Sequence, residues 1–268
     1  MCELFTMSSS TPSEVSFSLD EFSKHGGLTN LHRDGWGIAY YDNNDARIIK
    51  EACSASESNY LSFVKNLKIQ SKIIISHIRL ATQGEVSVRN TQPFSRELGG
   101  RQHVFVHNGH FAEINGNLSS KLKRFTPIGT TDSETSFCYL MEEMAKIWNQ
   151  ELPPSLVERV KVFASFCNKM RKYGIANFIY SDSDYTFIHS HKRLIKNGLK
   201  DSAPGLYILH RACPLNTVES NIDGVQIKTD EAQKVIIAAS VPLSNENWKA
   251  LEEGDINVFQ NGEIIAPL

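Results

Sequence analysis

Cys2 directly follows the initiator Met1 and could carry out covalent chemistry from that position. Its side chain is small enough for an aminopeptidase to remove Met1 and leave cysteine as the new N-terminus. Such a residue carries a thiol and a free α-amine, whose unperturbed pKa of about 7.7 to 8.0 lets it accept the proton of the thiol. One residue can then supply both nucleophile and base. The alternative is that cysteine at position 2 has no chemical role.

Other residues offer what an attack by Cys2 on an amide would require. The tetrahedral intermediate carries an oxyanion, and Asn108 and Gly109 can provide a side-chain amide and a backbone N–H to stabilise it. If the substrate is an amino acid, the Arg79 guanidinium can bind its α-carboxylate as a fork, and the Asp132 carboxylate can bind its α-ammonium. These residues would together form a nucleophile, an oxyanion hole and a clamp for a zwitterion.

Each of these residues also has a plainer interpretation. Asn108–Gly109 is a common turn dipeptide, and Arg79 could form a surface ion pair at a strand end. Asp132 could simply cap a helix. Trp36 could line a substrate pocket, although packing in the core is the commoner role of a large aromatic side chain. The joint presence of these residues in one chain is what favours a catalytic site.

The sequence predicts helices in two groups. Two residues, Leu61 and Val64, mark a short helix, and Thr131–Glu134 reads as a capping box that opens a longer one. Another helix follows Pro153–Pro154. An earlier helix is predicted from apolar residues at helical spacing before two glycines: Val15, Leu19 and Phe22, then Gly26 and Gly27. The later helices carry these apolar stripes: Phe137, Leu140, Met141, Met144 and Trp148, then Leu156, Val160, Phe163, Cys167 and Met170.

Strands are predicted between and after the helices, mostly in hairpins. The β-branched segment Lys72–Ile78 is expected to be a central strand, and His103–His107 is expected to end at an Asn108–Gly109 turn. Hairpins and further strands are predicted as follows: 36–41 with 47–49, 176–180 with 185–189, 205–209, 235–239, and a last hairpin turning at Asn261–Gly262. This order is typical of an α+β fold in which helices cover the outer faces of antiparallel sheets, not of alternating βαβ units.

The composition is that of an ordinary globular protein. The chain has 268 residues, of which 41% are hydrophobic, and a net charge of -2, so nothing indicates nucleic acid or a membrane surface. No apolar run approaches the roughly 18 to 20 residues that span a bilayer, and no secretory signal is present. Five cysteines without a CxxC pair favour a reducing compartment, hence a cytoplasmic location.

A metal or cofactor site is not expected. His103, His107 and His110 are closely spaced, and His189 and His191 form another pair, but no carboxylate or cysteine completes a tetrahedral set. The glycines do not form a phosphate-binding loop. The remaining thiols have no predicted role: Cys138 and Cys167 lie on apolar helical stripes, and Cys53 and Cys213 lie in turn-like stretches.

The chain resembles the class II glutamine amidotransferases, the glutaminase domains of the N-terminal nucleophile (Ntn) hydrolase superfamily. The resemblance covers most of the chain and rests on these motifs: Met1–Cys2, Arg79-x-Ala81-Thr82-x-Gly84, His107–Gly109 and Thr131–Glu134. Further segments resemble the stand-alone YafJ-like branch: Met1–Leu4, His32–Gly37, His77–Arg79 and Arg96–Leu98. Members of related branches hydrolyse γ-glutamyl amides.

The resemblance implies a four-layer αββα sandwich of two mainly antiparallel sheets, formed by residues 2–268 as a single glutaminase domain. It assigns the same roles that chemistry suggested to Cys2, Asn108, Gly109, Arg79 and Asp132, and it adds Thr82 as a wall of the pocket. It implies no cofactor. Two residues depart from the synthase-linked members: Glu3 follows Cys2 where glycine is usual, and Gln83 stands where many have histidine.

The expected activity is cleavage of the side-chain amide of glutamine, or of a γ-glutamyl compound, through a thioester on Cys2. No acceptor domain is expected, so the ammonia either passes to a separate acceptor subunit or is simply released. A catalytically silent, γ-glutamyl-binding regulatory subunit is the alternative, although such a subunit has no reason to keep the Cys2 thiol. A homodimer is the further partner considered.

Overall fold

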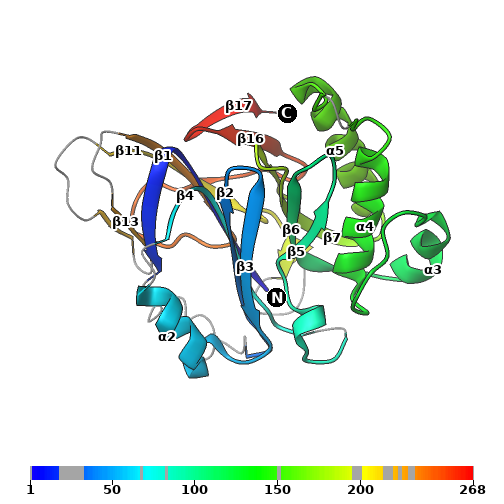
Figure 1. Ribbon diagram of the computed structural model, residues 1–268, viewed down its shortest axis with the longest axis horizontal. Coiled ribbons are helices and arrows are strands. Elements are labelled where there is room, and N and C mark those ends of the chain that lie inside the picture. The colour runs from blue at the N-terminus through cyan, green and yellow to red at the C-terminus, as the bar shows by residue number, and fades with distance from the viewer. Residues whose placement is uncertain are drawn as a thin grey trace.

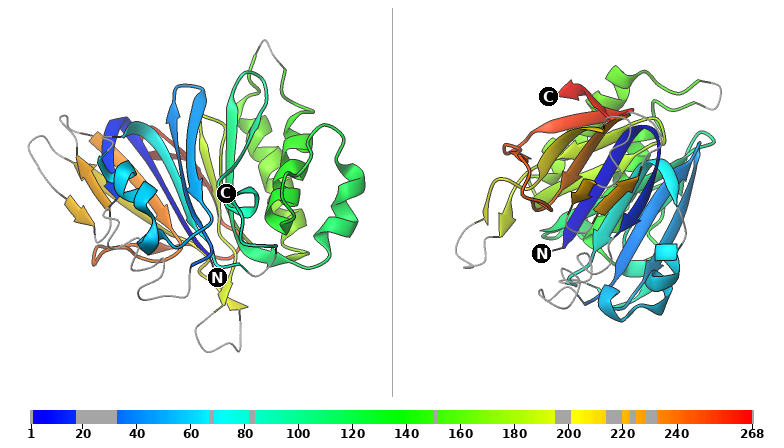
Figure 2. Two further views of the ribbon diagram at one scale, coloured as in Figure 1. Left: turned by 60° about the horizontal axis from the view of Figure 1, so that its bottom comes forward. Right: turned by 90° about the vertical axis from the view of Figure 1, so that its left-hand side faces the viewer.

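Two antiparallel sheets lie face to face, and helices cover their outer faces (Figure 1). The computed structural model describes residues 2–17, 33–66, 69–81, 84–149, 152–194, 201–213, 220–222, 225–228 and 233–267. The edge-on view separates the layers, with α2 against one sheet and α3, α4 and α5 beyond the other (Figure 2). The expected α+β class and its four-layer αββα sandwich are therefore confirmed.

The nine-stranded sheet has the strand that follows Cys2 near its centre. Its order is β15-β11-β14-β1-β4-β2-β3, with β13 pairing the far half of β1 and β12 pairing β13. The strands are β1 Glu3–Phe17, β2 Trp36–Asp42, β3 Asp45–Glu51, β4 Gln70–Ile78, β11 Tyr207–Cys213, β12 Ser220–Ile222, β13 Val225–Lys228, β14 Gln233–Ala239 and β15 Lys249–Ala250. Strand β1 is thus held by β4 on one side and by β14 on the other.

The six-stranded sheet has the order β17-β16-β8-β7-β6-β5. Its strands are β5 Phe94–Glu97, β6 Gln102–Phe111, β7 Gly174–Ser181, β8 Thr186–His189, β16 Ile256–Gln260 and β17 Glu263–Pro267. A small separate ribbon pairs β9, Arg193–Leu194, with β10, Asp201–Ser202. The helices are α2 Asn59–Asn66, α3 Ile114–Leu118, α4 Asp132–Met144 and α5 Leu156–Met170, with short 3-10 turns at Ala55–Glu57, Val88–Asn90 and Ser119–Lys121.

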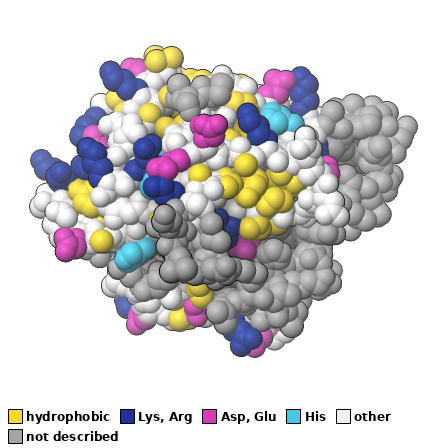
Figure 3. Space-filling view, turned by 180° about the vertical axis from the view of Figure 1, so that it is seen from behind, with side chains coloured by type: hydrophobic (Ala, Val, Ile, Leu, Met, Phe, Trp, Pro, Cys, Tyr) yellow, Lys and Arg dark blue, Asp and Glu magenta, His cyan; other side chains and the backbone are white. Residues whose placement is uncertain are grey.

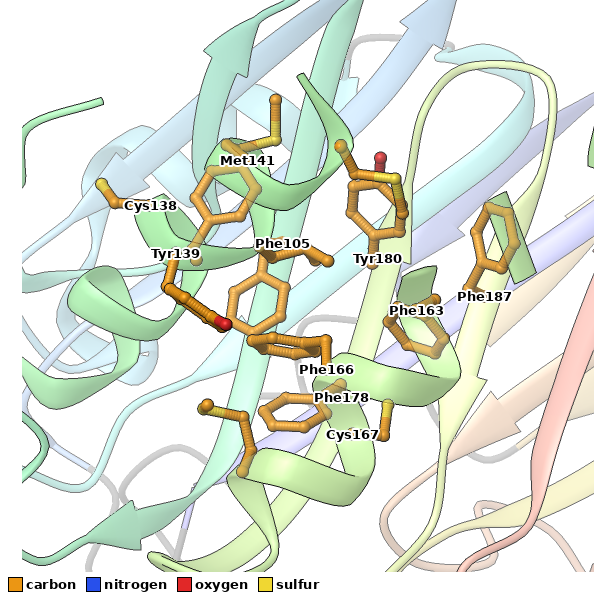
Figure 4. Close-up of a cluster of buried hydrophobic side chains, with 14 of the residues drawn as sticks. Phe105, Cys138, Tyr139, Met141, Phe163, Phe166, Cys167, Phe178, Tyr180 and Phe187 are labelled. Atoms are coloured by element: carbon orange, nitrogen blue, oxygen red, sulfur yellow. The ribbon is translucent and has the colours of Figure 1, made fainter. Parts of the chain in front are cut away.

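Three apolar layers hold these elements together. One lies between the six-stranded sheet and its helices, and it contains a cluster of aromatic rings around Phe105 (Figure 4). The second lies between the two sheets and is built from aliphatic residues such as Ile75 and Val106. The third lies between the nine-stranded sheet and α2, and it includes Trp36 and Leu61. On the face seen in Figure 3, basic and acidic side chains are interspersed.

The structure corrects two sequence predictions. Asn108–Gly109 is not a turn, because β6 continues to Phe111 and pairs these two residues with Asn177 and Ala176 of β7. Pairing along a whole neighbouring strand outweighs the local turn preference of the dipeptide. Val15 lies in β1 and not in a helix, while Leu19 and Phe22 fall outside the described residues.

Only half of the predicted capping box forms. The Thr131 side chain accepts a hydrogen bond from the Glu134 backbone N–H at 3.2 Å. The buried Glu134 carboxylate, however, binds Arg96 at 2.6 Å and the backbone N–H groups of Ile128 and Gly129. It therefore ties the preceding loop to β5 instead of closing the box.

The aromatic cluster provides a test of the fold. Phe105 is completely buried, and its ring lies 5.1 Å from that of Phe137 and 5.3 Å from that of Phe178. We expect Phe105→Ala to lower the free energy of unfolding by about 3–5 kcal/mol, because a cavity replaces the ring. Val157→Ala, on the exposed side of α5, should change it by less than about 0.5 kcal/mol. Urea denaturation measures both, and equal effects would contradict the packing described.

Candidate active site

Cys2 stands at the start of the central strand β1, half-buried next to the end of β4. Glu3 pairs with Ile78, the last residue of β4, so the chain that leaves β4 passes directly beside Cys2. The backbone N–H of Leu80 donates to the Cys2 Sγ at 3.3 Å, and Sγ lies 3.5 Å from the Leu80 carbonyl oxygen. Among the described residues, the hydrogen-bond partner of the thiol is therefore Leu80, in the segment after β4.

The pKa of Cys2 reflects opposing influences. Burial raises the pKa above its ordinary value, and the hydrogen bond from Leu80 and the charge of Arg79 lower it. The charge of Asp132 raises it again. Burial prevails, so the thiol holds its proton near neutral pH and needs a base to become a nucleophile.

Asn108 reaches Cys2 from the opposite sheet. It lies within β6, and its side-chain Nδ2 donates to the Cys2 carbonyl oxygen at 2.5 Å and to the Ser240 Oγ at 3.3 Å. The Ser240 Oγ also accepts from the backbone N–H of Leu4 at 3.0 Å. The contact between the two sheets therefore brings Asn108 to the residue predicted to be the nucleophile.

Buried amides on both sides fix the backbone around Asn108. The Gln92 side chain accepts from the His107 backbone N–H at 2.6 Å and donates to the His107 carbonyl at 3.1 Å. The Asn177 Nδ2 donates to the Asn108 carbonyl at 3.0 Å. Gly109 lies so close to β7 that a Cβ there would stand 1.9 Å from the Ile175 carbonyl oxygen, which excludes any larger residue.

Arg79 follows β4 and has a buried side chain. Its backbone N–H donates to the Gly35 carbonyl at 2.8 Å. Its Nη1 donates to the Glu85 carbonyl at 3.1 Å and its Nη2 to the Gly84 carbonyl at 3.3 Å. Burial lowers the pKa of Arg79, and the nearby charges of Cys2 and Asp34 raise it. A guanidinium so placed keeps its charge and presents a fork beside the thiol.

Asp34 holds the segment that carries both Arg79 and Leu80. Its Oδ2 accepts from the Ala81 backbone N–H at 2.7 Å, and its own N–H donates to the Arg79 carbonyl at 3.3 Å. These bonds fix the direction in which the Leu80 N–H points. The carboxylate of Asp34 thus positions the donor to the thiol without contacting the thiol itself.

Asp132 is the first residue of α4 and is buried. Its Oδ2 accepts from the Phe111 backbone N–H at 2.7 Å, and its Oδ1 accepts from the Ser133 N–H at 2.8 Å. The exposed His110 places its Nδ1 3.6 Å from the same Oδ2. Asp132 therefore joins α4 to the end of β6, and its charge also acts on Cys2. The helix-end role is therefore observed, and the binding of an α-ammonium by Asp132 stays a prediction.

Trp36, Thr82 and His107 are three other residues that the sequence analysis singled out. Trp36 is completely buried in the core beside α2, which favours the core-packing alternative over a pocket wall. Thr82 lies outside the described residues, as does Gln83. His107 is buried, and its Nε2 donates to the Ile175 carbonyl at 2.9 Å, so its Nδ1 accepts from Ser133. Burial lowers the pKa of His107, so the ring is neutral.

The described part of the chain contains no group of three or more His, Cys, Asp or Glu side chains that could hold a metal ion. His103, for example, bonds through its two ring nitrogens to Tyr180 and to the Leu98 carbonyl, and burial lowers its pKa to about 3. Within the described ranges, no helix is long and apolar enough to cross a membrane.

The sequence analysis missed several residues that shape the site. Ser240 directly follows the correctly predicted strand β14. A polar residue at a strand end is a signal in the sequence that could have marked Ser240 as a candidate site residue. Gln92 and Asn177 gave no such signal, because their partners are backbone groups far away in the sequence. Asp34 was noted only within the His32–Gly37 segment of the family resemblance.

The chain is similar to known proteins along nearly its whole length. The family model described as "Glutamine amidotransferases class-II" matches residues 1–267. A Haemophilus influenzae protein described as a glutamine amidotransferase is 34% identical over 99% of this chain and 86% of its own length. YafJ of Escherichia coli, described in the same way, is 31% identical over 98% of this chain and 99% of its own length.

Solved structures show the same fold. A predicted glutamine amidotransferase from Pseudomonas aeruginosa superposes with a TM-score of 0.71 at 30% identity, over 99% of this chain and 100% of its own. The glutamine phosphoribosylpyrophosphate amidotransferase of Bacillus subtilis superposes with a TM-score of 0.58 at 16% identity, over 98% of this chain and 48% of its own. At that identity, the second likeness shows the fold alone.

The Asp34 anchor can be tested through the reactivity of the thiol. Asp34→Ala should free the segment after β4 and weaken the Leu80 N–H bond, which raises the pKa of Cys2 further. We expect alkylation of Cys2 by iodoacetamide at pH 8 to slow about threefold to tenfold, the worth of one hydrogen bond. Peptide mass spectrometry measures the rate at Cys2.

Two further variants make this test specific. Asp34→Asn keeps an acceptor for the Ala81 N–H and should slow alkylation less. Asp45→Ala removes an exposed carboxylate from a hairpin turn and should leave the rate unchanged. Equal rates in Asp34→Ala and the unaltered protein would show that Asp34 does not position Leu80.

Proposed function

The chain belongs to the class II glutamine amidotransferases, and we propose that it cleaves the side-chain amide of glutamine or of a γ-glutamyl compound through a thioester on Cys2. The observation that carries this proposal is the meeting of Cys2 and Asn108 across the two sheets, with the Asn108 amide 2.5 Å from the Cys2 carbonyl. The opposed charges of Arg79 and Asp132 both act on the same thiol. A nucleophile, an amide donor and a clamp are thus combined.

The first step generates the nucleophile. Removal of Met1 frees the α-amine of Cys2, which takes the proton of the thiol directly or through a water. An α-amine suits this task, because its unperturbed pKa of about 7.7 to 8.0 leaves a neutral fraction at neutral pH. Burial keeps the pKa of the thiol high, so the base is needed and the thiolate is strongly nucleophilic when formed.

Attack on the substrate amide then forms a tetrahedral intermediate. Asn108 Nδ2 and the Gly109 N–H stabilise its oxyanion. Both hydrogens of Nδ2 have partners in the free protein, and the 3.3 Å contact to Ser240 is the longer one, so the oxyanion replaces that partner. The C–N bond breaks, ammonia or an amine leaves with a proton from the Cys2 ammonium, and water hydrolyses the thioester to release glutamate.

The remaining residues hold the substrate. Arg79 binds the α-carboxylate, Asp132 binds the α-ammonium, and Thr82 lines the pocket. Binding of the carboxylate replaces backbone carbonyls of residues 84 and 85 as partners of the Arg79 guanidinium. The released ammonia either passes to a separate acceptor subunit or leaves with the products.

The central experiment removes the thiol. Cys2→Ala should lower glutamate release from glutamine and from γ-glutamyl amides by about 10³-fold or more, since the covalent route is lost. Cys53→Ala, another half-buried thiol, should keep full activity. Intact mass shows whether Met1 is removed, and the unfolding midpoint confirms that the variants fold. Turnover that survives in Cys2→Ala would refute the mechanism.

Arg79 is tested by a conservative change. Arg79→Lys keeps the charge but loses the two-pronged geometry, so we expect the KM for the γ-glutamyl substrate to rise about tenfold or more. The value of kcat should change less than KM, because the α-carboxylate stays distant from the reacting bond. Steady-state kinetics of glutamate release measure both constants.

Arg89→Lys is the matched control for this change. Arg89 lies in the nearby 3-10 turn, and its half-exposed side chain pairs with Glu85. Its replacement should leave KM unchanged. An unchanged KM in Arg79→Lys would remove Arg79 from the proposed clamp.

A further inference from the structure

A second guanidinium, that of Arg193, lies on the opposite side of strand β1 from Arg79. Strand β1 pairs with β4 on one side and with β14 on the other. Arg79 directly follows β4, and Ser240 directly follows β14. The Nη1 of Arg193 donates to the Ser240 carbonyl oxygen. The two arginines therefore flank the start of β1, where Cys2 lies, from its two sides.

A short chain of contacts joins Arg193 to the nucleophile. Ser240, whose carbonyl binds Arg193, accepts the Asn108 Nδ2 on its Oγ at 3.3 Å. The same Nδ2 lies 2.5 Å from the Cys2 carbonyl oxygen. Burial lowers the pKa of Arg193, and the charges of Glu3, Tyr207 and Cys2 raise it, which is consistent with this proximity.

Within the described part of the chain, most N–H donors of the Arg193 guanidinium have no hydrogen-bond partner. Among the described residues, Ser240 is the one hydrogen-bond partner of its guanidinium, and no carboxylate forms an ion pair with it. The Arg193 side chain is only partly exposed. Arginine has five N–H donors in a planar fork that matches a carboxylate. A guanidinium anchored by one nitrogen and open at the others is suited to bind an anion.

The direction of the substrate in the proposed reaction leads toward this fork. Arg79 and Asp132 hold the α-carboxylate and the α-ammonium, and Arg79 lies on the β4 side of β1. A substrate that is held at Arg79 and reaches Cys2 with its γ-amide would direct its amine portion toward the β14 side, where Arg193 bonds the Ser240 carbonyl. Glutamine has no group there beyond its amide nitrogen, whereas a γ-glutamyl amino acid carries a carboxylate.

Resting on the proposed function, we infer that Arg193 binds a carboxylate on the amine portion of the substrate, so that γ-glutamyl amides of amino acids or peptides are preferred over uncharged amides. The reaction remains a hydrolysis. Water adds across the γ-glutamyl C–N bond, glutamate is formed, and an amino acid or a peptide leaves in place of ammonia.

A pair of substrates that differ in one charge tests this inference. γ-Glutamylglycine ends in a carboxylate, and γ-glutamylglycinamide ends in a neutral amide of nearly the same shape. In the unaltered enzyme, we expect kcat/KM to be at least about tenfold higher for γ-glutamylglycine, as a charge-assisted forked pair predicts. Glutamate release measures both values, and their ratio is the readout.

Variants of Arg193 should change that ratio. Arg193→Gln should bring it close to one, and Arg193→Lys should give an intermediate value, because the charge remains without the fork. The value of kcat/KM can also fall for both substrates, because Arg193 holds the Ser240 carbonyl. A purely structural role of Arg193 would lower both values by the same factor and leave their ratio unchanged. Arg47→Gln, which alters an exposed arginine of the β2–β3 hairpin, should keep the original ratio.

The outcomes separate this inference from the proposed function. Cleavage of both compounds without a preference, or an unchanged ratio in Arg193→Gln, overturns the role of Arg193 and leaves the hydrolase standing. If neither compound is cleaved and glutamine is not cleaved either, the proposed function fails, and calorimetry with Cys2→Ala tests Arg193 separately. The role of Arg193 is supported if γ-glutamylglycine binds more tightly than its amide and this difference is lost in Arg193→Gln. Equal binding of the two compounds would overturn it.

Discussion

The contact between Asn108 and Cys2 depends on the packing of the two sheets, and the chemistry of the site depends on that contact. Cys2 begins β1 in one sheet, and Asn108 lies within β6 of the other. The aliphatic layer between the sheets, which includes Ile75 and Val106, sets their separation. Burial of this layer provides the free energy that offsets the cost of placing polar groups beside it.

Around this contact, several polar side chains bond to backbone groups that lie far away in the sequence. Gln92 pairs both backbone groups of His107, and Asp34 receives the Ala81 N–H. Such bonds satisfy polar atoms that would otherwise be costly to bury, and they leave few alternative positions for the backbone. The donors near Cys2 are therefore fixed before any substrate arrives, which is how an enzyme avoids reorganisation during reaction.

The charges around Cys2 are arranged on three sides. Arg79 lies beyond β4, Arg193 beyond β14, and Asp132 at the start of α4. Burial of the thiol raises its pKa, and the neighbouring guanidinium of Arg79 lowers it. We propose that a zwitterion binds between Arg79 and Asp132, and that a second anionic group binds on the side of Arg193.

The sequence by itself determined the α+β class, most hairpins, the helices around Phe137 and Phe163, and the chemistry available to Cys2, because these follow from local periodicity and residue type. It misplaced Asn108–Gly109 in a turn, since local preference cannot register the pairing with β7. Only the tertiary structure decided that Trp36 packs in the core and that Ser240 and Arg193 adjoin Asn108. Those contacts join residues far apart in the chain, and packing of the sheets creates them.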